Sequence, residues 1–460
     1  MHPHPVDEDP RLSLWRRVRE YAVPPAMIEA ATARRRSGDW AGACAAARVD
    51  VDLRLRDLTR THGRDLTARI RADLRHMAPD LLRWHMPRSA PDGLLRPGLT
   101  VPLARYDPDG PYGPRPVTLV VRTPPAWAAG GQRMSLALWD GDRLRDGSRD
   151  HPRPRPGRRF RFDLHRHLWD ARRAHELRHR SGADGPADGD GAPSGLLPPG
   201  HHHAVDRWAD EARVLLRDEG RTEGGVVVRI DARRRLVLTL PGDGRGPRAV
   251  PAELAGKDGT FGAQPLLPDA ATHVLPDLAL LRAGAIDPGR LHPLVATALA
   301  PGHPAAPRTP PAPDATRPHV VICRGIPHRV ALVDGVLVPL DHTPDEIRRE
   351  ELLAELTGTP LPCLRFVDRA HRGPDCLTGV RERLDHGDVD GALAVVEHLL
   401  GADARLRDGP LRDALDTAAS RQLAHGLYRA GLRGPADHWV LPAPARPRDR
   451  RSRPRHATNL

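Results

Sequence analysis

The sequence predicts an α+β protein of several domains, with helical hairpins at both ends and small antiparallel sheets between them. Three observations support this fold class. Helical composition dominates the first 88 residues and the stretch that follows residue 343. Three segments between residues 99 and 140 alternate apolar and polar residues with period two. The chain has 460 residues, which is too long for one ordinary hydrophobic core.

The first 88 residues are expected to form a helical domain. Helices are predicted at Leu12–Ala22, at Pro25–Arg36, where the Pro residues mark the start, and near Asp65–Met77. Residues 89–180 form the second predicted domain. It has three antiparallel strands (LTVPLARY, PVTLVVRT and RMSLALWD) followed by a basic helix, Asp163–Arg180.

Two stretches poor in apolar residues are predicted to be linkers. Residues 181–200 (SGADGPADGDGAPSGLLPPG) are expected to be disordered, and the Pro/Ala-rich residues 300–318 to be extended. Between them, residues 201–299 predict a small α/β domain. Its expected elements are a helix at Val205–Glu219, strands at Val226–Ile230 and Leu236–Leu240, and helices near Pro276–Ala285 and Pro288–Ala298.

The third region, residues 319–436, carries the clearest local signals. Val330–Leu340 (VALVDGVLVPL) predicts a β-hairpin, because Asp-Gly at its centre supplies the positive φ values of a two-residue turn. Thr343 and Glu346 form the capping-box pattern of a helix that begins at Pro344. The chain is then expected to be helical to about Leu432, and residues 437–460 to be a disordered Arg/Pro tail.

One short motif occurs twice. SGDWAGACAAA (Ser37–Ala47) and HGDVDGALAVV (His386–Val396) share Gly-Asp-x-x-Gly-Ala-x-Ala after an Arg-rich helix. The first Gly is expected to end one helix and the Asp to cap the next. The motif locally resembles the turn of a tetratricopeptide-like helical hairpin, but a solenoid needs about three stacked units. We favour two unrelated hairpins with the same turn chemistry.

Two N-terminal segments carry a further resemblance. EYAVPPAMIEAATARRRSGDWAGACAAA (Glu20–Ala47) and DLLRWHMPR (Asp80–Arg88) resemble uncharacterised conserved proteins of GC-rich bacteria. Such proteins are associated with operons of MoxR-type AAA ATPases and von Willebrand A proteins, so the resemblance implies an AAA ATPase system as a partner. It implies no activity and assigns no functional residue. A GC-rich origin agrees with the composition, because Lys257 is the single Lys among 71 basic residues.

The net charge of +12 is concentrated in two segments. Residues 151–180 hold ten Arg against three acidic residues (+7), and residues 442–460 hold six Arg against Asp449 (+5). Basic patches of this size can attract nucleic acid or an acidic partner. A nucleic-acid-binding protein is therefore one alternative, although a solvated helix face and a disordered tail explain the charge more simply.

The sharpest chemical motif is HExxH at residues 175–179. On a helix, His175 and His179 lie on one face and can share a zinc ion while Glu176 activates a bound water, which would make the protein a zinc-dependent hydrolase. At 100° per residue the two imidazoles also extend the apolar stripe of Leu164 and Leu168.

We nevertheless expect no catalytic zinc at HExxH. A third ligand of the metzincin type would fall on Gly185, and four Arg crowd the helix. Other nearby residues that could be tried as ligands are His201, His202, His203 and Glu211. The simpler interpretation is that His175 and His179 are partly buried imidazoles or lie at a frayed helix end.

Two weaker patterns do not predict sites. Gly242–Gly246 (GDGRG) follows a strand, but its third Gly lies one place early for a dinucleotide fingerprint, so a strand-connecting loop is expected. A second set could in principle meet at a zinc: Cys323, His328, Cys363, His371 and Cys376. Their spacings match no standard zinc knuckle, and lone Cys residues usually pack as small apolar groups.

The remaining signals concern location and function class. Four Cys form no disulfide framework, no signal peptide begins the sequence and no run of 18 apolar residues occurs, so we expect a cytoplasmic protein without membrane contact. No catalytic set is complete, and helical hairpins with flexible linkers suit partner binding. The preferred hypothesis is therefore a non-enzymatic interaction or scaffold protein without a cofactor.

Overall fold

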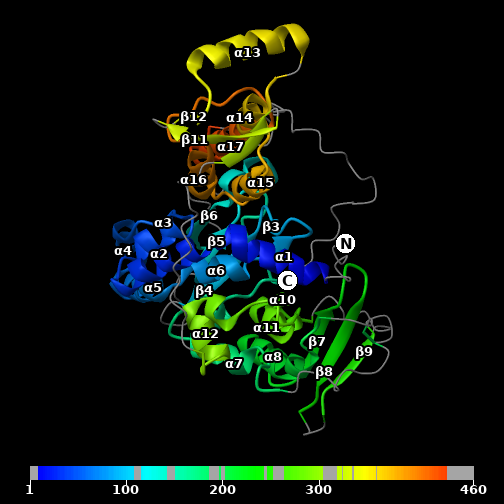
Figure 1. Ribbon diagram of the computed structural model, residues 1–460. Coiled ribbons are helices and arrows are strands. Elements are labelled where there is room, and N and C mark those ends of the chain that lie inside the picture. The colour runs from blue at the N-terminus through cyan, green and yellow to red at the C-terminus, as the bar shows by residue number, and fades with distance from the viewer. Residues whose placement is uncertain are drawn as a thin grey trace. The chain divides into compact units, whose positions relative to one another are not determined.

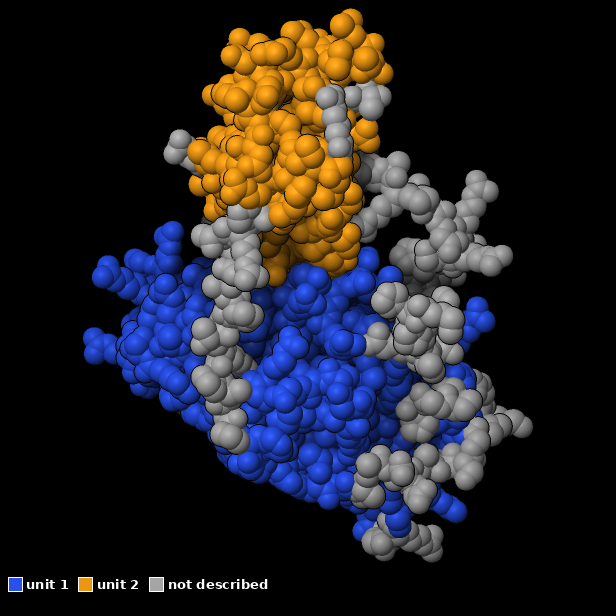
Figure 2. Space-filling view, viewed as in Figure 1, with its two compact units in different colours: residues 1–126, 133–307, 430–460 blue, residues 127–132, 308–429 orange. Residues whose placement is uncertain are grey.

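Two compact units make up the structure, which is a computed structural model. It describes residues 9–107, 116–141, 151–185, 196–197, 202–242, 246–251, 264–303, 319–323, 325–333, 336–358 and 360–432. Unit 1 comprises residues 1–126, 133–307 and 430–460, and unit 2 comprises residues 127–132 and 308–429 (Figure 2). Helices and small, mostly antiparallel sheets build both units, which confirms the α+β prediction (Figure 1).

Helices build the N-terminal part of unit 1. They are α1 (Pro10–Arg17), the π-helical turn η1 (Val18–Ala22), α2 (Pro25–Arg36), α3 (Trp40–Ala46), α4 (Leu55–His62), α5 (Arg64–His76) and α6 (Pro79–His85). The predicted helices at Leu12–Ala22, Pro25–Arg36 and Asp65–Met77 are confirmed. The Asp9 side chain caps α1 by accepting a hydrogen bond from Arg11 N (2.9 Å).

A four-stranded sheet with the order β1-β6-β5-β4 follows these helices. β4 (Thr100–Tyr106), β5 (Val117–Arg122) and β6 (Met134–Trp139) pair antiparallel, as predicted, and the short β1 (Val49–Val51) adds a parallel edge beside β6. Every residue of β5 is buried, because the strand is central and both of its faces are covered. A separate ribbon pairs β2 (Arg88–Ser89) with β3 (Leu94–Leu95).

The predicted helix Asp163–Arg180 is wrong. The segment forms two 3-10 turns, η4 (Arg166–Leu168) and η5 (Ala174–Glu176), and one short helix, α7 (Leu177–Arg180). Its backbone pairs with the end of α5 instead: Ala78 N donates to Trp169 O (2.7 Å) and Ala171 N donates to His76 O (2.9 Å). These long-range hydrogen bonds use backbone N–H and C=O groups that would otherwise form the internal hydrogen bonds of a continuous helix.

The middle of the chain adds a second sheet and further helices to unit 1. The elements are α8 (Val205–Asp218), β7 (Gly224–Arg229), β8 (Arg235–Leu240), β9 (Arg248–Pro251), α10 (Asp269–Thr272), α11 (Pro276–Arg282), the 3-10 turn η7 (Pro288–Arg290) and α12 (Pro293–Leu299). The predicted helices and strands of this region are present, except that the helix predicted near Pro288–Ala298 is divided into η7 and α12 by the extended backbone of Leu291 and His292. β8 and β9 pair antiparallel, so GDGRG connects two adjacent strands, although residues 243–245 lie outside the described residues.

One hydrophobic core joins the N-terminal helices, the four-stranded sheet, α11 and α12 of unit 1, while α8, β7 and β8 share a second core. The first core extends from Leu14 on α1 through the four-stranded sheet to Val295 on α12, so residues 1–88, 89–180 and 201–299 all contribute to it. A buried carboxylate lies within this unit. Asp277 on α11 accepts a hydrogen bond from Trp84 Nε1 (2.7 Å) and pairs with Arg19 (3.3 Å), which ties three distant parts of the chain together.

A small sheet and a group of helices build unit 2. The elements are β10 (His319–Cys323), β11 (Ile326–Val333), β12 (Val336–Pro339), α13 (Pro344–Thr357), α14 (Pro362–Arg372), α15 (Leu377–Asp385), α16 (Val389–Leu400) and α17 (Pro410–Arg429), with the 3-10 turn η3 (Gly130–Gln132) packed on α17. The hairpin prediction is confirmed, because Val333 pairs with Val336 and leaves two residues for the turn. The capping box of Thr343 and Glu346 is also present.

The two Gly-Asp turns have the same backbone geometry. Gly38 between α2 and α3 has φ of 82°, and Gly387 between α15 and α16 has φ of 81°. Each following Asp N–H donates to an Arg carbonyl five residues earlier (2.9 and 2.7 Å), and the side chain of that Arg pairs with the Asp. Shared turn chemistry therefore explains the repeated motif.

Most of the predicted linkers and the tail fall outside the described residues, namely residues 186–195, 198–200, 304–318 and 437–460. Residues 181–185 form a turn in which Ser181 is buried. Within the described part of the chain, no helix combines the length and the apolar character that a membrane span requires.

Candidate metal centre

Four potential metal ligands meet in unit 2. The ligand atoms of Cys323, His328, His342 and Cys363 all lie within 4.8 Å of one another. Both Cys are buried and both His are half-buried. Two thiols and two imidazoles gathered so closely are a candidate metal centre, and the local folding of unit 2 explains how each arrives there.

The register of the sheet places the first two ligands. Cys323 ends β10 and pairs with Ile326 across a tight turn in which Gly325 has φ of 85°. Directly opposite residues of an antiparallel pair point to the same face, and every second residue along a strand does so as well. Because His328 lies two residues beyond Ile326, the side chains of Cys323 and His328 are diagonal neighbours on the inner face of the sheet.

An ion pair places the third ligand. After β12 the chain continues along β11, where Leu340 N donates to Arg329 O (2.8 Å). The carboxylate of Asp341 accepts from Arg329 N (2.6 Å) and from Arg329 Nη2 (2.6 Å). This fixes the residue that follows Asp341, so His342 Nε2 lies 2.6 Å from His328 Nδ1.

Helix α14 supplies the fourth ligand. Pro362 occupies its first position and Cys363 its second, at the start of a buried stripe that continues with Val367 and Ala370. α14 packs on β10 and β12, which carries Cys363 to the sheet ligands (Figure 1). Burial, and then the neighbouring Cys323 thiol, raise the pKa of Cys363 to about 12. This thiol therefore needs a nearby cation to ionise at neutral pH.

The donor set is chemically specific. Thiolate sulfur together with imidazole nitrogen suits zinc and other transition metals, whereas calcium and magnesium require oxygen ligands. Four protein ligands complete a tetrahedral sphere, as in structural zinc sites, while catalytic sites keep one position open for water or substrate. The cluster thus fits a closed, structural zinc site.

Sequence reasoning found part of this cluster. Of the five residues considered from the sequence, Cys323, His328 and Cys363 come together. His371 lies two turns further along α14 and Cys376 directly precedes α15, so neither joins them. His342 was missed because it lies beyond the end of β12, in a turn where the alternation of the hairpin no longer holds; the extended register would place residue 341, and not residue 342, on the face of His328.

The HExxH motif lies elsewhere, on unit 1. It spans a 3-10 turn and the short α7 rather than one helix, and His175 and His179 are both exposed instead of extending an apolar stripe. Glu176 pairs with Arg173. Of the residues considered as a third ligand, Glu211 binds Arg180 and His165, and His203 lies 3.2 Å from Ile230 O, while His201 lies outside the described residues.

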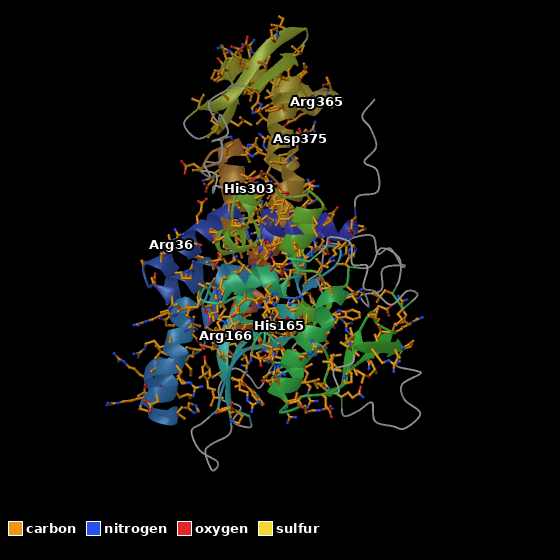
Figure 3. All side chains as sticks on the ribbon, turned by 90° about the horizontal axis from the view of Figure 1, so that it is seen from below. Arg36, His165, Arg166, His303, Arg365 and Asp375 are labelled. Carbon is orange, nitrogen blue, oxygen red and sulfur yellow. The ribbon has the colours of Figure 1, made fainter. Side chains whose placement is uncertain are left out.

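The basic segment 151–180 is largely neutralised by acidic neighbours. Seven of its ten Arg pair with carboxylates: Arg159 with Asp269, Arg161 with Asp163 and Asp218, Arg166 and Arg172 with Asp73 and Asp170, Arg173 with Glu176, Arg178 with Asp184, and Arg180 with Glu211. Figure 3 shows His165 and Arg166 among these side chains. The formal charge of +7 therefore overstates the field of this surface.

Buried imidazoles lie beside these ion pairs. His165 Nε2 is 3.1 Å from Glu211, and both side chains are buried. Burial, and then Arg180, lower the pKa of the neighbouring His167 well below its usual value, so this ring stays neutral near pH 7. These buried groups link the segment 161–180 to α8 within unit 1.

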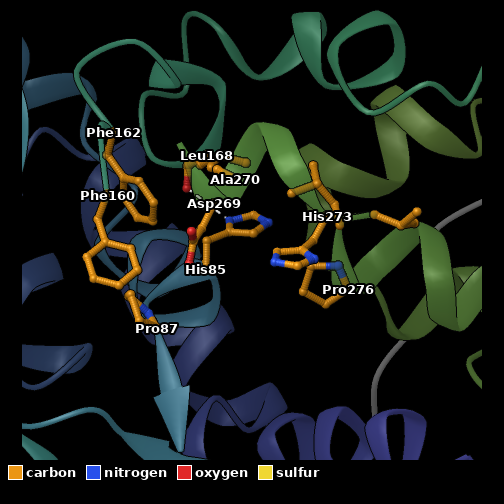
Figure 4. Close-up of a pocket in the computed structure, with 11 residues that line it drawn as sticks. His85, Pro87, Phe160, Phe162, Leu168, Asp269, Ala270, His273 and Pro276 are labelled. Atoms are coloured by element: carbon orange, nitrogen blue, oxygen red, sulfur yellow. Dashed lines mark hydrogen bonds between the residues drawn. The ribbon is translucent and has the colours of Figure 1, made fainter. Parts of the chain in front are cut away.

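Unit 1 also has a small pocket (Figure 4). Its empty volume is about 420 Å³, open solvent at its mouth included, and Phe160 and Phe162 form one wall opposite His273. Asp269 in its lining accepts hydrogen bonds from Arg159 (2.8 Å) and Arg229 (3.2 Å). Burial, and then His203, lower the pKa of His273. The lining of this pocket therefore combines a carboxylate held by two Arg with an imidazole that is neutral near pH 7.

Comparison with known proteins adds no relative to this description. No family model matches the chain, no curated protein matches it, and no solved structure matches it. Any functional inference therefore depends on the geometry of the described residues. The most specific arrangement among them is the cluster of Cys and His in unit 2.

Proposed function

We propose that the protein is a non-enzymatic interaction protein and that unit 2 is its zinc-stabilised binding module. The observation that carries the proposal is the complete set of Cys323, His328, His342 and Cys363, in which two ligands come from a sheet, one from the chain after it and one from a helix. A zinc ion there would bind all three elements together and leave no coordination position for a substrate.

The surface of unit 2 supports an interaction role. The outer face of the sheet carries exposed apolar residues on three strands: Val320 and Ile322 on β10, Val333 on β11 and Val336 on β12. Among the described strands of this sheet β10 lies at the edge, and an edge strand can pair with a strand of another chain. These residues form two separate apolar spots, one on β10 and one where Val333 pairs with Val336, and Arg329 and Ala331 lie between them along β11. Exposed apolar side chains of this kind can serve as anchors for another protein.

The ion pairs of unit 1 favour this role over nucleic-acid binding. A nucleic-acid interface needs Arg side chains that are available to phosphates, and most Arg of residues 151–180 already bind carboxylates. The closed ligand set and the exposed histidines of HExxH likewise favour a structural zinc over the hydrolase alternative.

Metal analysis of full-length protein purified without an affinity tag tests the proposal. We expect about one equivalent of zinc, lost in the Cys323→Ser/Cys363→Ser variant and retained in the matched control Cys376→Ser. His328→Ala should lower zinc affinity, whereas His371→Ala on the same face of α14 should not. Protein without bound zinc, or zinc lost equally in Cys376→Ser, would contradict the proposal. Zinc lost in His175→Ala/His179→Ala would instead support the hydrolase.

A further inference from the structure

Two thiols of the candidate metal centre lie close enough together to react with each other. The Sγ atoms of Cys323 and Cys363 lie within 4.8 Å of each other, and both side chains are buried. All four Cys of the chain are described and are free thiols, but Cys44 lies in unit 1 and Cys376 lies outside the cluster. Cys323 and Cys363 are therefore the pair from which an intramolecular disulfide can form.

The elements that carry the two thiols are already in contact. Cys323 ends β10, Cys363 occupies the second position of α14, and α14 packs on β10. The sulfur atoms of a disulfide lie about 2.0 Å apart, so the two Sγ atoms must approach by less than about 3 Å. Each Sγ lies on a rotatable Cα–Cβ bond, and rotation of both side chains supplies this approach while the strand and the helix stay packed together.

Zinc and a disulfide compete for the same two sulfur atoms. In the proposed zinc site both sulfurs are thiolates that bind the metal, and oxidation to a disulfide removes both charges. The two states also join different parts of unit 2. Zinc would hold His328 and His342 in addition to both Cys, whereas a disulfide joins only β10 to α14. Oxidation therefore keeps α14 on the sheet and frees the two imidazoles from the metal.

Loss of the metal from His342 affects the segment that follows it. Residues 343–362, which carry α13, form an excursion that starts after His342 and returns at Cys363. No residue of α13 is buried, so its position depends on its two ends. In the disulfide state the start of the excursion is held by the pair of Asp341 with Arg329, which is 58% exposed. An exposed ion pair stabilises little, so this end of α13 becomes looser.

Burial limits the oxidant to a small molecule. Both thiols are buried and both imidazoles are half-buried, so the imidazole side of the cluster is nearer to solvent. Oxidation of a thiol depends on access to its sulfur. Hydrogen peroxide is little larger than water, whereas a peptide disulfide such as glutathione disulfide is too bulky to reach a buried sulfur.

We propose that Cys323 and Cys363 are a redox switch, in which a peroxide converts the zinc-bound pair to a disulfide, releases the metal and loosens the start of α13. This rests on the proposed zinc-stabilised module and adds its regulation. One thiolate attacks a peroxide oxygen, the O–O bond breaks with loss of hydroxide, and a sulfenic acid forms. The second thiolate attacks that sulfur, forms the S–S bond and displaces a second hydroxide. Two electrons pass from sulfur to peroxide, and with two protons the products are the disulfide, two waters and free Zn²⁺.

The test exposes full-length, zinc-loaded protein to hydrogen peroxide. Zinc released to a chromophoric chelator, free thiols in denaturant and disulfide-linked tryptic peptides are followed together. We expect free thiols to fall from four to two, about one equivalent of zinc to be released at the same rate, and the linked peptides to contain Cys323 and Cys363. Dithiothreitol with added zinc should restore the starting state. The matched control Cys376→Ser should still release zinc and form the linked peptides, whereas Cys363→Ser should form none.

Two further measurements test the oxidant and the structural effect. Glutathione disulfide at the same concentration should release zinc at least roughly tenfold more slowly than peroxide. The Ile347 amide donates to Thr343 O (3.0 Å) at the start of α13, and its hydrogen exchange should become faster after oxidation while exchange in α14 stays the same.

Several outcomes would overturn the switch. They are a disulfide that involves Cys376, a sulfinic acid at either thiol without linked peptides, equally fast zinc release by glutathione disulfide, and unchanged exchange at Ile347. Metal content separates the two proposals. Bound zinc that peroxide does not release refutes the switch alone, whereas a Cys323–Cys363 disulfide in protein that never binds zinc refutes the metal centre and leaves the thiol pair.

Discussion

Alanine at the two Gly-Asp turns provides a matched pair of perturbations. Gly38 and Gly387 have nearly the same φ, 82° and 81°, and the same flanking hydrogen bonds. They differ in their surroundings. A Cβ on Gly38 would meet no atom within 4 Å, whereas a Cβ on Gly387 would lie 2.1 Å from the carbonyl oxygen of Gly131, within unit 2.

The loss of stability that each alanine substitution causes follows from this geometry. The left-handed conformation costs an alanine about 1–2 kcal/mol at either site. At Gly387 the new methyl group must also displace a backbone oxygen by roughly 1 Å, and overpacking of this kind typically costs a further 1–3 kcal/mol. Gly38→Ala should therefore reduce stability by about 1–2 kcal/mol, and Gly387→Ala by about 2–5 kcal/mol.

Native-state hydrogen exchange of the full-length protein measures both effects in their own unit. Protection factors of amides in α2–α3 report the first substitution, and those in α15–α16 report the second. The size of the difference between the variants is the informative quantity. Equal losses at the two turns would show that the Gly131 contact contributes nothing and that the reasoning from close approach fails.

Three further predictions concern unit 1. Burial lowers the pKa of His167 and His273 in the folded state, so the unfolded chain binds more protons than the folded chain once the pH falls below the unfolded His pKa of about 6.5. The urea midpoint of unit 1 should therefore be constant above that pH and fall as the pH decreases. A midpoint that rises in acid would contradict this. Asp277→Ala leaves the buried Arg19 and Trp84 Nε1 without this acceptor and should cost about 3–5 kcal/mol by denaturant titration, whereas Asp107→Ala, at a 65% exposed side chain of the same unit, should cost less than about 1 kcal/mol; similar losses would refute the role of burial. His175→Ala/His179→Ala removes two exposed side chains and should leave the melting temperature within error, so a drop of several degrees would reveal a structural role for the motif.

Local chemistry explains which elements could be predicted from the sequence. Some helices begin with a proline or a capping box, such as α2 and α13, so the residues that mark the start lie within a few positions of it. The hairpin of β11 and β12 likewise depends on its own two-residue turn. Asp163–Arg180 could not be predicted in the same way, because its backbone partners at residues 76 and 78 lie far away along the chain.

Long-range packing also hid most of the candidate site. The ligand Cys363 reaches the sheet because α14 packs on β10, and no spacing rule contains that contact. His342 depends on the Arg329–Asp341 pair, which is visible only once the hairpin register is extended beyond its strands. The buried contact of Trp84 with Asp277, which helps to join the parts of unit 1, is equally absent from any local pattern.

The position of α13 should allow unit 2 to tolerate changes in the sequence and length of residues 343–362. This excursion starts after His342 and returns at Cys363, which are neighbours in the candidate metal centre, and no residue of α13 is buried. The entropy of closing such an excursion grows only with the logarithm of its length, so doubling it would cost about 0.6 kcal/mol. This site could therefore accept longer, shorter or foreign recognition sequences while the rest of the unit folds as before, which makes it a natural graft point for redirecting the protein to a new target.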